Sequence, residues 1–340
     1  MTPGGSLRVH APDGTPEVAA GDDLLGLVLT VLGDAGLDLA DGDVLVVTSK
    51  AVAKAEGRVV DGTREEHLDA ETARLVARRG PTRIVRTHHG LTLAAAGIDA
   101  SNVATGRVVL LPVDPDATAG RLREEVLART GRTVGVVVTD TAGRAWREGQ
   151  TDIAVGAAGL VVLDDHAGRV DAHGNPLLVT APAVADEIAG AAELAQGKLH
   201  ARPFAVVRGR ADLVLAADDD GPGARALVRP EGADLFGWGA REAVVRAVRG
   251  DVEDAAPFGS AAAVEDLVTA LGVALGDGAA VRPAGPGLLH LDLDPGGGHH
   301  PAREGGMHAV VFAHGWVADR AAGSSTYALR PRSAGPPAGP

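Results

Sequence analysis

The sequence predicts a protein of mixed α/β or α+β class. Short apolar segments at 43–48, 107–112 and 134–139 are typical of buried strands. Segments with apolar residues three and four positions apart indicate helices, and the two kinds of element alternate irregularly without a visible repeat. Hydrophobic residues make up 45% of the 340 residues and aromatic residues only 2%, so the core must consist mostly of Ala, Val, Leu and Ile.

From the N-terminus, residues 6–11 predict a short strand, and the leucines and valines of 22–38 predict a helix. After the strand at 43–48 the chain breaks at Ser49 and Lys50, and we expect it to continue in an extended conformation. The remaining elements follow from the same reasoning. We expect helices at 65–79, 117–130 and 183–194, and strands at 83–86, 107–112, 134–139, 158–163 and 203–208.

A change of composition near 250–257 predicts two parts. The first is a domain over 1–248, followed by a linker at 249–257. The second is a small α+β appendage over 258–330, for which the sequence indicates no role. Within the appendage we expect a helix at 261–275, a strand at 288–292, a loop at 295–301 and a strand at 307–313, and we expect 331–340 to be a disordered tail.

Net charge and composition exclude several classes of partner. The formal net charge of −13 repels nucleic acid and anionic membranes, although a local cluster of basic residues can still bind a small anion. Without cysteine the chain has no disulfide, thiolate metal site or cysteine nucleophile. The N-terminus does not resemble a signal peptide, and no apolar run reaches the roughly 18 residues of a membrane span. We therefore expect a cytoplasmic protein.

Two loops beside predicted strands carry residues suited to ligands, a position that open α/β sheets favour for binding. In the first, Ser49, Lys50 and Lys54 bring a hydroxyl and two ammonium groups, which suit phosphate oxygens. An ordinary loop with solvated lysines explains the same residues. In the second, Asp99 and Asn102 share a tight turn and could face one centre, but Asp99 could equally cap the turn through its own backbone.

The third loop is the most informative. Asp140 and Thr141 follow the buried strand at 134–139, and Arg144 and Arg147 come shortly after. Mg²⁺ prefers carboxylate oxygens together with substrate phosphates, and arginine binds phosphate or carboxylate in a two-pronged fork. The alternative is a helix cap with surface arginines.

Other polar clusters carry less information. The pairs His88-His89 and His299-His300 are unsuited to holding a single metal, because neighbouring residues on a strand point to opposite faces. The acidic turn at 218–221 could supply a further metal ligand or be simply solvated.

In chain order, four segments resemble the coenzyme F420:L-glutamate ligase family, the γ-glutamyl ligases of deazaflavin coenzyme biosynthesis. The segments are VVTSKAVAKAEGR, AAAGIDASNV, VVVTDTAGRAWREGQTDIAVGAAG and AVADEIAGAAELAQGK. The resemblance covers roughly residues 7–245. Many actinobacterial relatives carry an additional FMN-binding nitroreductase-like domain, for which residues 251–340 are too few and of which they show no pattern.

The resemblance implies a family-specific fold of mixed sheets and helices, usually a homodimer. It implies that GTP is consumed with Mg²⁺ or Mn²⁺, and possibly K⁺, to join L-glutamate to the coenzyme F420-0 precursor. Asp99 and Asp140 would ligate one metal and Thr141 a second, with Asp220 as a further, loosely aligned ligand. The nucleotide would contact Thr15, Pro16, Glu17, Val18, Ser49, Lys54 and Asn102.

Amide formation from an unactivated carboxylate requires activation, for which an acyl phosphate formed from GTP is the natural solution. Arg144 and Arg147 are candidates to hold the acyl phosphate or the glutamate carboxylates, from residue type alone. Two alternatives stay open: another metal-dependent nucleotide hydrolase or transferase on this scaffold, and a non-catalytic deazaflavin-binding protein.

Overall fold

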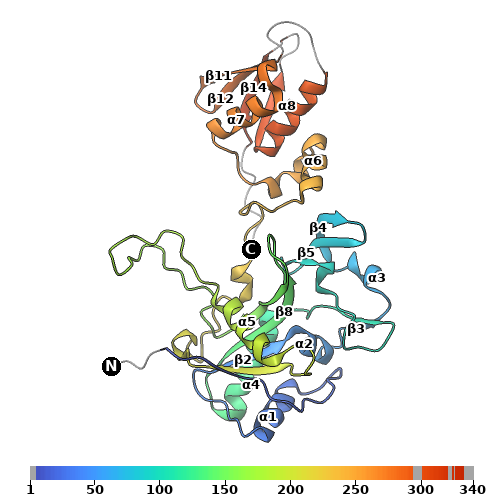
Figure 1. Ribbon diagram of the computed structural model, residues 1–340, viewed down its shortest axis with the longest axis vertical. Coiled ribbons are helices and arrows are strands. Elements are labelled where there is room, and N and C mark those ends of the chain that lie inside the picture. The colour runs from blue at the N-terminus through green and yellow to red at the C-terminus, as the bar shows by residue number, and fades with distance from the viewer. Residues whose placement is uncertain (1–4, 294–300, 321–323, 325, 333–340) are drawn as a thin grey trace. The chain divides into compact units, whose positions relative to one another are not determined.

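A computed structural model of the protein describes residues 5–293, 301–320, 324 and 326–332 (Figure 1). The chain forms two compact units. The first combines Met1–Leu75 with Thr82–Val228, and the second combines Val76–Pro81 with Arg229–Pro340. The second unit is therefore discontinuous in sequence. These two units are defined by contacts in space. The ligase domain expected over 1–248 is a functional assignment, and it stays a prediction.

A five-stranded mixed sheet forms the centre of the first unit. The third and fourth strands in spatial order run parallel, whereas every other neighbouring pair in the sheet is antiparallel. Most of its strand residues are buried, as expected for a sheet covered on both faces. In spatial order the strands are β1 (Arg8–His10), β10 (Phe204–Arg208), β2 (Val44–Thr48), β8 (Gly135–Gly143) and β9 (Gln150–Ala158).

Helices cover both faces of this sheet. Leu45 and Val47 of β2 belong to one apolar cluster, and Val44 and Val46 belong to another, because successive strand residues point to opposite faces. The first cluster includes helices α1 (Leu24–Asp34), α2 (Ser49–Ala55) and α4 (Pro115–Thr130), and the second includes α5 (Val184–Gln196). The result is a helix–sheet–helix arrangement, which confirms the predicted class (Figure 1).

Smaller elements complete the first unit beside the main sheet. Strand β3 pairs with β7, and β4, β5 and β6 form a three-stranded sheet in which β5 and β6 are antiparallel. The segment Val76–Pro81, from β4 into the turn before β5, belongs to the second unit. Their bounds are β3 (Val59–Asp61), α3 (Arg64–Leu68), β4 (Thr72–Arg79), β5 (Thr82–Thr87), β6 (Thr92–Ala94) and β7 (Arg107–Val109). Short 3-10 helices lie at Ala95–Gly97, Ala211–Leu213 and Ala224–Leu227.

The second unit contains its own apolar core, built from leucines of α7, β12 and β14 together with Met307 and Trp316. Its four strands lie in the order β11, β12, β14, β13, all antiparallel. The predicted linker at 249–257 contains two 3-10 turns, Val252–Asp254 and Ala256–Phe258. The elements are α6 (Ala240–Arg249), α7 (Val264–Leu275), β11 (Ala279–Gly285), β12 (Leu288–Leu293), α8 (Pro301–Ala313), β13 (Trp316–Arg320) and β14 (Thr326–Pro331).

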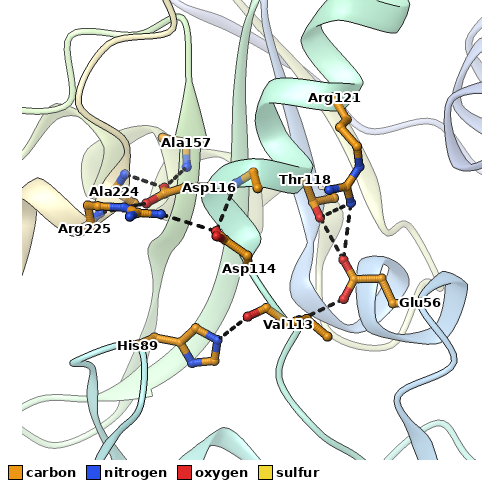
Figure 2. A network of polar contacts seen from close by, with 11 residues as sticks. Glu56, His89, Val113, Asp114, Asp116, Thr118, Arg121, Ala157, Ala224 and Arg225 are labelled. Carbon is orange, nitrogen blue, oxygen red and sulfur yellow. Dashed lines mark hydrogen bonds and ion pairs between the residues drawn. The ribbon is translucent and has the colours of Figure 1, made fainter.

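A polar network at the start of α4 fixes this helix against its neighbours (Figure 2). Glu56, at the end of α2, accepts hydrogen bonds from the Val113 amide at 2.9 Å and from the Thr118 hydroxyl at 2.7 Å. Asp116 accepts from the backbone amides of Ala157 on β9 and Ala224 beyond β10, at 2.9 and 2.7 Å. Because both carboxylates bond to main-chain groups, they tie α2, α4 and β9 together.

Four predicted elements were wrong. Residues 49–55 form helix α2 instead of continuing extended, and the helix expected at 65–79 ends at Leu68 and gives way to strand β4. The predicted strand at 158–163 is replaced by β9, which ends at Ala158 before Gly159 turns with a φ of 64°. The segment 307–313 is part of helix α8, with Met307 and Val311 buried one turn apart.

Short apolar runs do not distinguish a strand from a buried helix, which explains the error at 307–313. In the segment 65–79, Thr63 and Glu66 form a capping box at the start of helix α3. The later residues form β4 instead of helix, because they pair with β5. The predicted loop at 295–301, the pair His299-His300 and the tail beyond residue 332 lie outside the described residues, apart from Pro301 in α8.

Gly156 on β9 should be essential for stability, because a Cβ there would lie 2.4 Å from the Pro115 carbonyl carbon and oxygen. We expect Gly156→Ala to lower the free energy of unfolding by about 1–3 kcal/mol in urea denaturation. Gly33 on α1 is the control, since no atom lies within 4 Å of its Cβ position. Gly33→Ala should be neutral or stabilising by up to about 1 kcal/mol. Equal effects of the two substitutions would contradict this packing.

Candidate active site

A cavity of about 890 Å³ opens where strands β2 and β8 end. Because these two strands are parallel neighbours, the start of α2 and the last residues of β8 lie at the same edge of the sheet. Asp140 and Thr141, expected beyond the end of a strand, lie within β8 and pair with β9. The cavity brings together nearly all the side chains that the sequence singled out as ligand contacts. Those that line it are Thr15, Pro16, Glu17, Val18, Ser49, Lys54, Asp99, Asn102, Asp140 and Thr141.

Ser49 and Asp140 meet because Thr48 of β2 pairs in register with Thr139 of β8. The Ser49 hydroxyl, at the first residue of α2, donates to Asp140 Oδ1 at 3.1 Å. Burial raises the pKa of Asp140 to about 6, the charges of Asp152 and Asp99 add to this, and the hydrogen bonds from Ser49 and the Thr141 amide oppose it. Asp140 is therefore a carboxylate whose negative charge the protein alone compensates poorly.

Asp99 has the opposite environment. Lys50 Nζ lies 2.7 Å from Asp99 Oδ2, and the amide and hydroxyl of Ser101 each donate to the carboxylate at 2.8 Å. Burial alone would raise the pKa of Asp99, but these hydrogen bonds from Lys50 and Ser101 hold it at about 2. Asn102 follows with a φ of 55°, as the predicted tight turn requires.

Lys54 lies buried in the last turn of α2, and its side chain reaches the segment 15–18. Its ammonium forms an ion pair with Glu17, whose own side chain is mostly exposed. In that segment the hydroxyl of Thr15 is buried without a hydrogen-bond partner among the described residues. A buried lysine beside a turn with an unused hydroxyl is suited to an anionic ligand such as a phosphate.

The sequence profile of the family described as F420-0:gamma-glutamyl ligase matches residues 14–209, more than half of the chain. The chain belongs to the F420-0:gamma-glutamyl ligase family.

Three coenzyme F420:L-glutamate ligases resemble the chain over most of their own length. The coenzyme F420:L-glutamate ligase of Methanothermobacter thermautotrophicus is 35% identical over 245 residues, which is 66% of this chain and 96% of that protein. The ligase of the same name from Archaeoglobus fulgidus is 38% identical, over 60% of this chain and 88% of its own. The ligase of Halobacterium salinarum is also 38% identical, over 59% of this chain and 87% of its own length.

Membership of this family implies a divalent metal. The cavity residues suit a metal ion that is bound jointly by the protein and by a nucleotide. Among the described residues, no group of three or more His, Asp or Glu side chains could hold a metal ion. Asp99, Asp140 and Thr141 nevertheless line one cavity, and Asp99 and Asp152 repel the charge on Asp140. Mg²⁺ is commonly bound by one or two carboxylates plus substrate phosphates, so two aspartates and a hydroxyl are a suitable set.

Three residues assigned from the sequence do not line this cavity. Asp220 is 2.8 Å from the buried guanidinium of Arg123, which also binds carbonyl groups of 215–217. Arg144 and Arg147 lie in the exposed turn between β8 and β9, where Arg144 donates to the Glu148 carbonyl at 2.9 Å. The roles assigned to these three residues stay predictions.

Several other polar residues of the cavity received no role from the sequence. They include Asp152, Glu193, Gln196, Lys198 and Arg202. Asp152 accepts from the Thr141 hydroxyl at 2.7 Å, and Lys198 donates to the same hydroxyl at 2.9 Å. The position of Asp152 follows from the β8–β9 pairing, in which it lies opposite Thr141. A correct assignment of β9 in the sequence would have revealed it.

No helix among the described residues is long and apolar enough to cross a membrane. The cytoplasmic location expected from the sequence stays a prediction.

The buried charge of Asp140 predicts a pH-dependent stability difference. Its folded-state pKa of about 6 exceeds the ordinary value of 3.8, so its contribution to stability is fully present below pH 4 and is lost as pH rises through 6. Without metal or nucleotide, we expect Asp140→Asn to be more stable than the wild type by up to about 3 kcal/mol at pH 8.

The difference should be much smaller at pH 4, where Asp140 is protonated in the folded wild type. Urea unfolding at both pH values measures the difference. A variant less stable than the wild type at pH 8 would show that Asp140 is well compensated within the protein.

Proposed function

We propose that this protein ligates L-glutamate to the coenzyme F420-0 precursor through a γ-glutamyl amide bond, consuming GTP by way of an acyl phosphate. One observation carries the proposal: within a chain of this ligase family, all the residues assigned to the nucleotide line the same cavity as Asp99, Asp140 and Thr141. The relatives' names describe the same reaction partners, coenzyme F420 and L-glutamate.

The chemistry proceeds in two steps. A carboxylate oxygen of the precursor attacks the γ-phosphorus of GTP, the bond to the β-phosphate oxygen breaks, and GDP leaves. The amine of glutamate then attacks the acyl carbon, phosphate leaves, and the amine loses a proton. In the first step charge spreads over the transferring phosphoryl oxygens, so positive groups that face them accelerate the reaction.

The residues of the chain divide this work. Lys54, released from Glu17, places an ammonium at the phosphates, and the Ser49 hydroxyl can turn from Asp140 to a phosphate oxygen. Asp99, Asp140 and Thr141 would hold Mg²⁺ or Mn²⁺. Such a metal supplies neutralisation of the phosphoryl charge when it is bound. A potassium ion and a homodimer are further expectations from the family.

The deciding experiment incubates the purified protein with GTP, Mn²⁺, L-glutamate and the glutamate-free deazaflavin precursor, and follows product mass. We expect a GTP-dependent gain of one or more glutamyl units, with one GDP formed for each unit. Loss of GTP without a mass gain would favour a nucleotide hydrolase. No change in either would favour a non-catalytic deazaflavin-binding protein.

Asp140→Ala tests the metal assignment in the same assay. We expect ligation to fall by at least about 10³-fold, because the cation would lose a charged ligand while the phosphates keep their charge. Asp34→Ala is the matched control, since Asp34 is an exposed carboxylate on α1 outside the cavity lining. Near-normal ligation by Asp140→Ala would refute the role of Asp140 in holding the metal.

A further inference from the structure

The turn between β8 and β9 carries an exposed tryptophan. Trp146 is 87% exposed, whereas the next most exposed aromatic side chain among the described residues is Phe236, at 53%. The other two tryptophans are engaged, since Trp316 is buried and Trp238 packs against an arginine guanidinium. Tryptophan is largely buried in most folded proteins, so exposure of this ring in a chain with only 2% aromatic residues indicates a planar or apolar partner.

The backbone of this turn presents Trp146 in a fixed conformation. Trp146 has a φ of 67°, in the left-handed region that bulky side chains rarely adopt. Within the same turn, Arg144 donates to the Glu148 carbonyl at 2.9 Å, and Gly149 has a φ of 81°. Arg144 therefore closes the turn with its guanidinium. Bulky residues persist in this conformation where the surrounding structure holds them, and they are concentrated at ligand-binding sites.

The turn lies directly beyond the cavity. Strand β8 carries Asp140 and Thr141 and stays paired with β9 as far as Gly143 and Gln150, which both line the cavity. Gly143 lies roughly 10 Å along the strand from Asp140, and Trp146 follows it at the tip of the turn. A ligand that reaches from Asp140 to the indole must therefore be an extended molecule, longer than a single amino acid.

One substrate of the proposed reaction has this shape. The deazaflavin precursor must place its carboxylate at the position of phosphoryl transfer, and its planar ring system lies at the other end of its side chain. Planar heteroaromatic rings stack on aromatic side chains largely irrespective of their substituents. Arg147, exposed next to Trp146, adds a cation for the anionic side chain, which matters in a chain with a net charge of −13.

The guanine of GTP suits this position less well. The residues assigned to the nucleotide come from the segment 15–18, from α2 and from Asn102, and none comes from the β8–β9 turn. The γ-phosphate is the point where the two substrates meet. A nucleotide that extends from there toward α2 leaves the side of the β8–β9 turn to the acyl substrate.

We propose that Trp146 is the stacking platform for the deazaflavin ring of the acyl-donating substrate. Its indole covers one face of the ring, and Arg147 contacts the anionic side chain of the same molecule. Arg144 is a positioning residue, because its guanidinium is engaged with the Glu148 carbonyl and holds the turn. This inference rests on the proposed function, because it names where one substrate of that reaction binds.

Trp146→Ala tests the platform, and Trp146→Phe keeps an aromatic face at the same position. With GTP and L-glutamate saturating, we expect Trp146→Ala to raise the KM for the deazaflavin precursor about tenfold or more. Trp146→Phe should stay within about threefold of the wild type. In both variants the KM values for GTP and L-glutamate should change by less than about twofold. The melting temperature should be unchanged, because the side chain is exposed.

A second probe separates the ring from the reacting carboxylate. A deazaflavin that ends in its ribityl chain carries the ring but cannot be activated or ligated. We expect it to inhibit the wild type competitively with the precursor. Its inhibition constant should rise in Trp146→Ala by about the same factor as the KM for the precursor. Inhibition of equal strength in both proteins would show that the ring binds elsewhere.

The control is Val273→Ala, since Val273 is 86% exposed on α7 and lies outside the cavity lining. It should change none of the three KM values. If the wild type forms no glutamyl product, the proposed function fails and the platform with it. If the wild type ligates glutamate but Trp146→Ala leaves the KM for the precursor unchanged, or raises the KM for GTP instead, only the platform is refuted. A lower melting temperature with an unchanged KM for the precursor would assign Trp146 a packing role.

Discussion

The parallel pairing of β2 with β8 is the constraint on which the site depends. It aligns Thr48 with Thr139, so the chain leaves both strands at one edge of the sheet. After β2 the chain turns at once into α2, which presents Ser49 and Lys54, whereas β8 continues through Asp140 and Thr141 into a hairpin with β9. A shift of one residue in this pairing would turn Asp140 away from Ser49 and toward the other face of the sheet.

In this cavity some polar groups have their charge or hydrogen-bonding capacity matched by neighbouring residues, and others do not. Asp99 is paired with Lys50 and Ser101, and the pKa of Asp99 is about 2. Asp140 has a pKa of about 6, and the polar atoms of Gln196 are buried without described partners. Such local deficits lower stability and are concentrated where ligands bind. By contrast, Arg123 and Asp116, outside this cavity, are fully used in holding neighbouring segments.

The sequence predicted the fold class and most elements of the central sheet, because short runs rich in valine, such as 134–139, favour buried strands over helices. It failed where the sequence pattern is ambiguous. The segment 307–313 is apolar at both strand and helix periods, and only tertiary packing selects the helix. For the site, motifs located Asp99, Asp140 and Lys54, but Gln196 carries no motif. Its amide atoms are buried and have no hydrogen-bond partner among the described residues, which only a three-dimensional structure reveals.

The second unit includes Val76–Pro81, which lies in sequence between the two segments of the first unit. This affects where the chain can be truncated. Within that unit the Gly239 amide donates to the Val76 carbonyl at 2.9 Å, and Glu242 accepts from the Arg78 amide at 3.0 Å. A stop codon after residue 228 would therefore remove the C-terminal region and also strip the β4–β5 turn of its hydrogen-bond partners. A single cut after residue 228 would leave Val76–Pro81, the part of the second unit that comes from β4 and the turn before β5, on the N-terminal fragment.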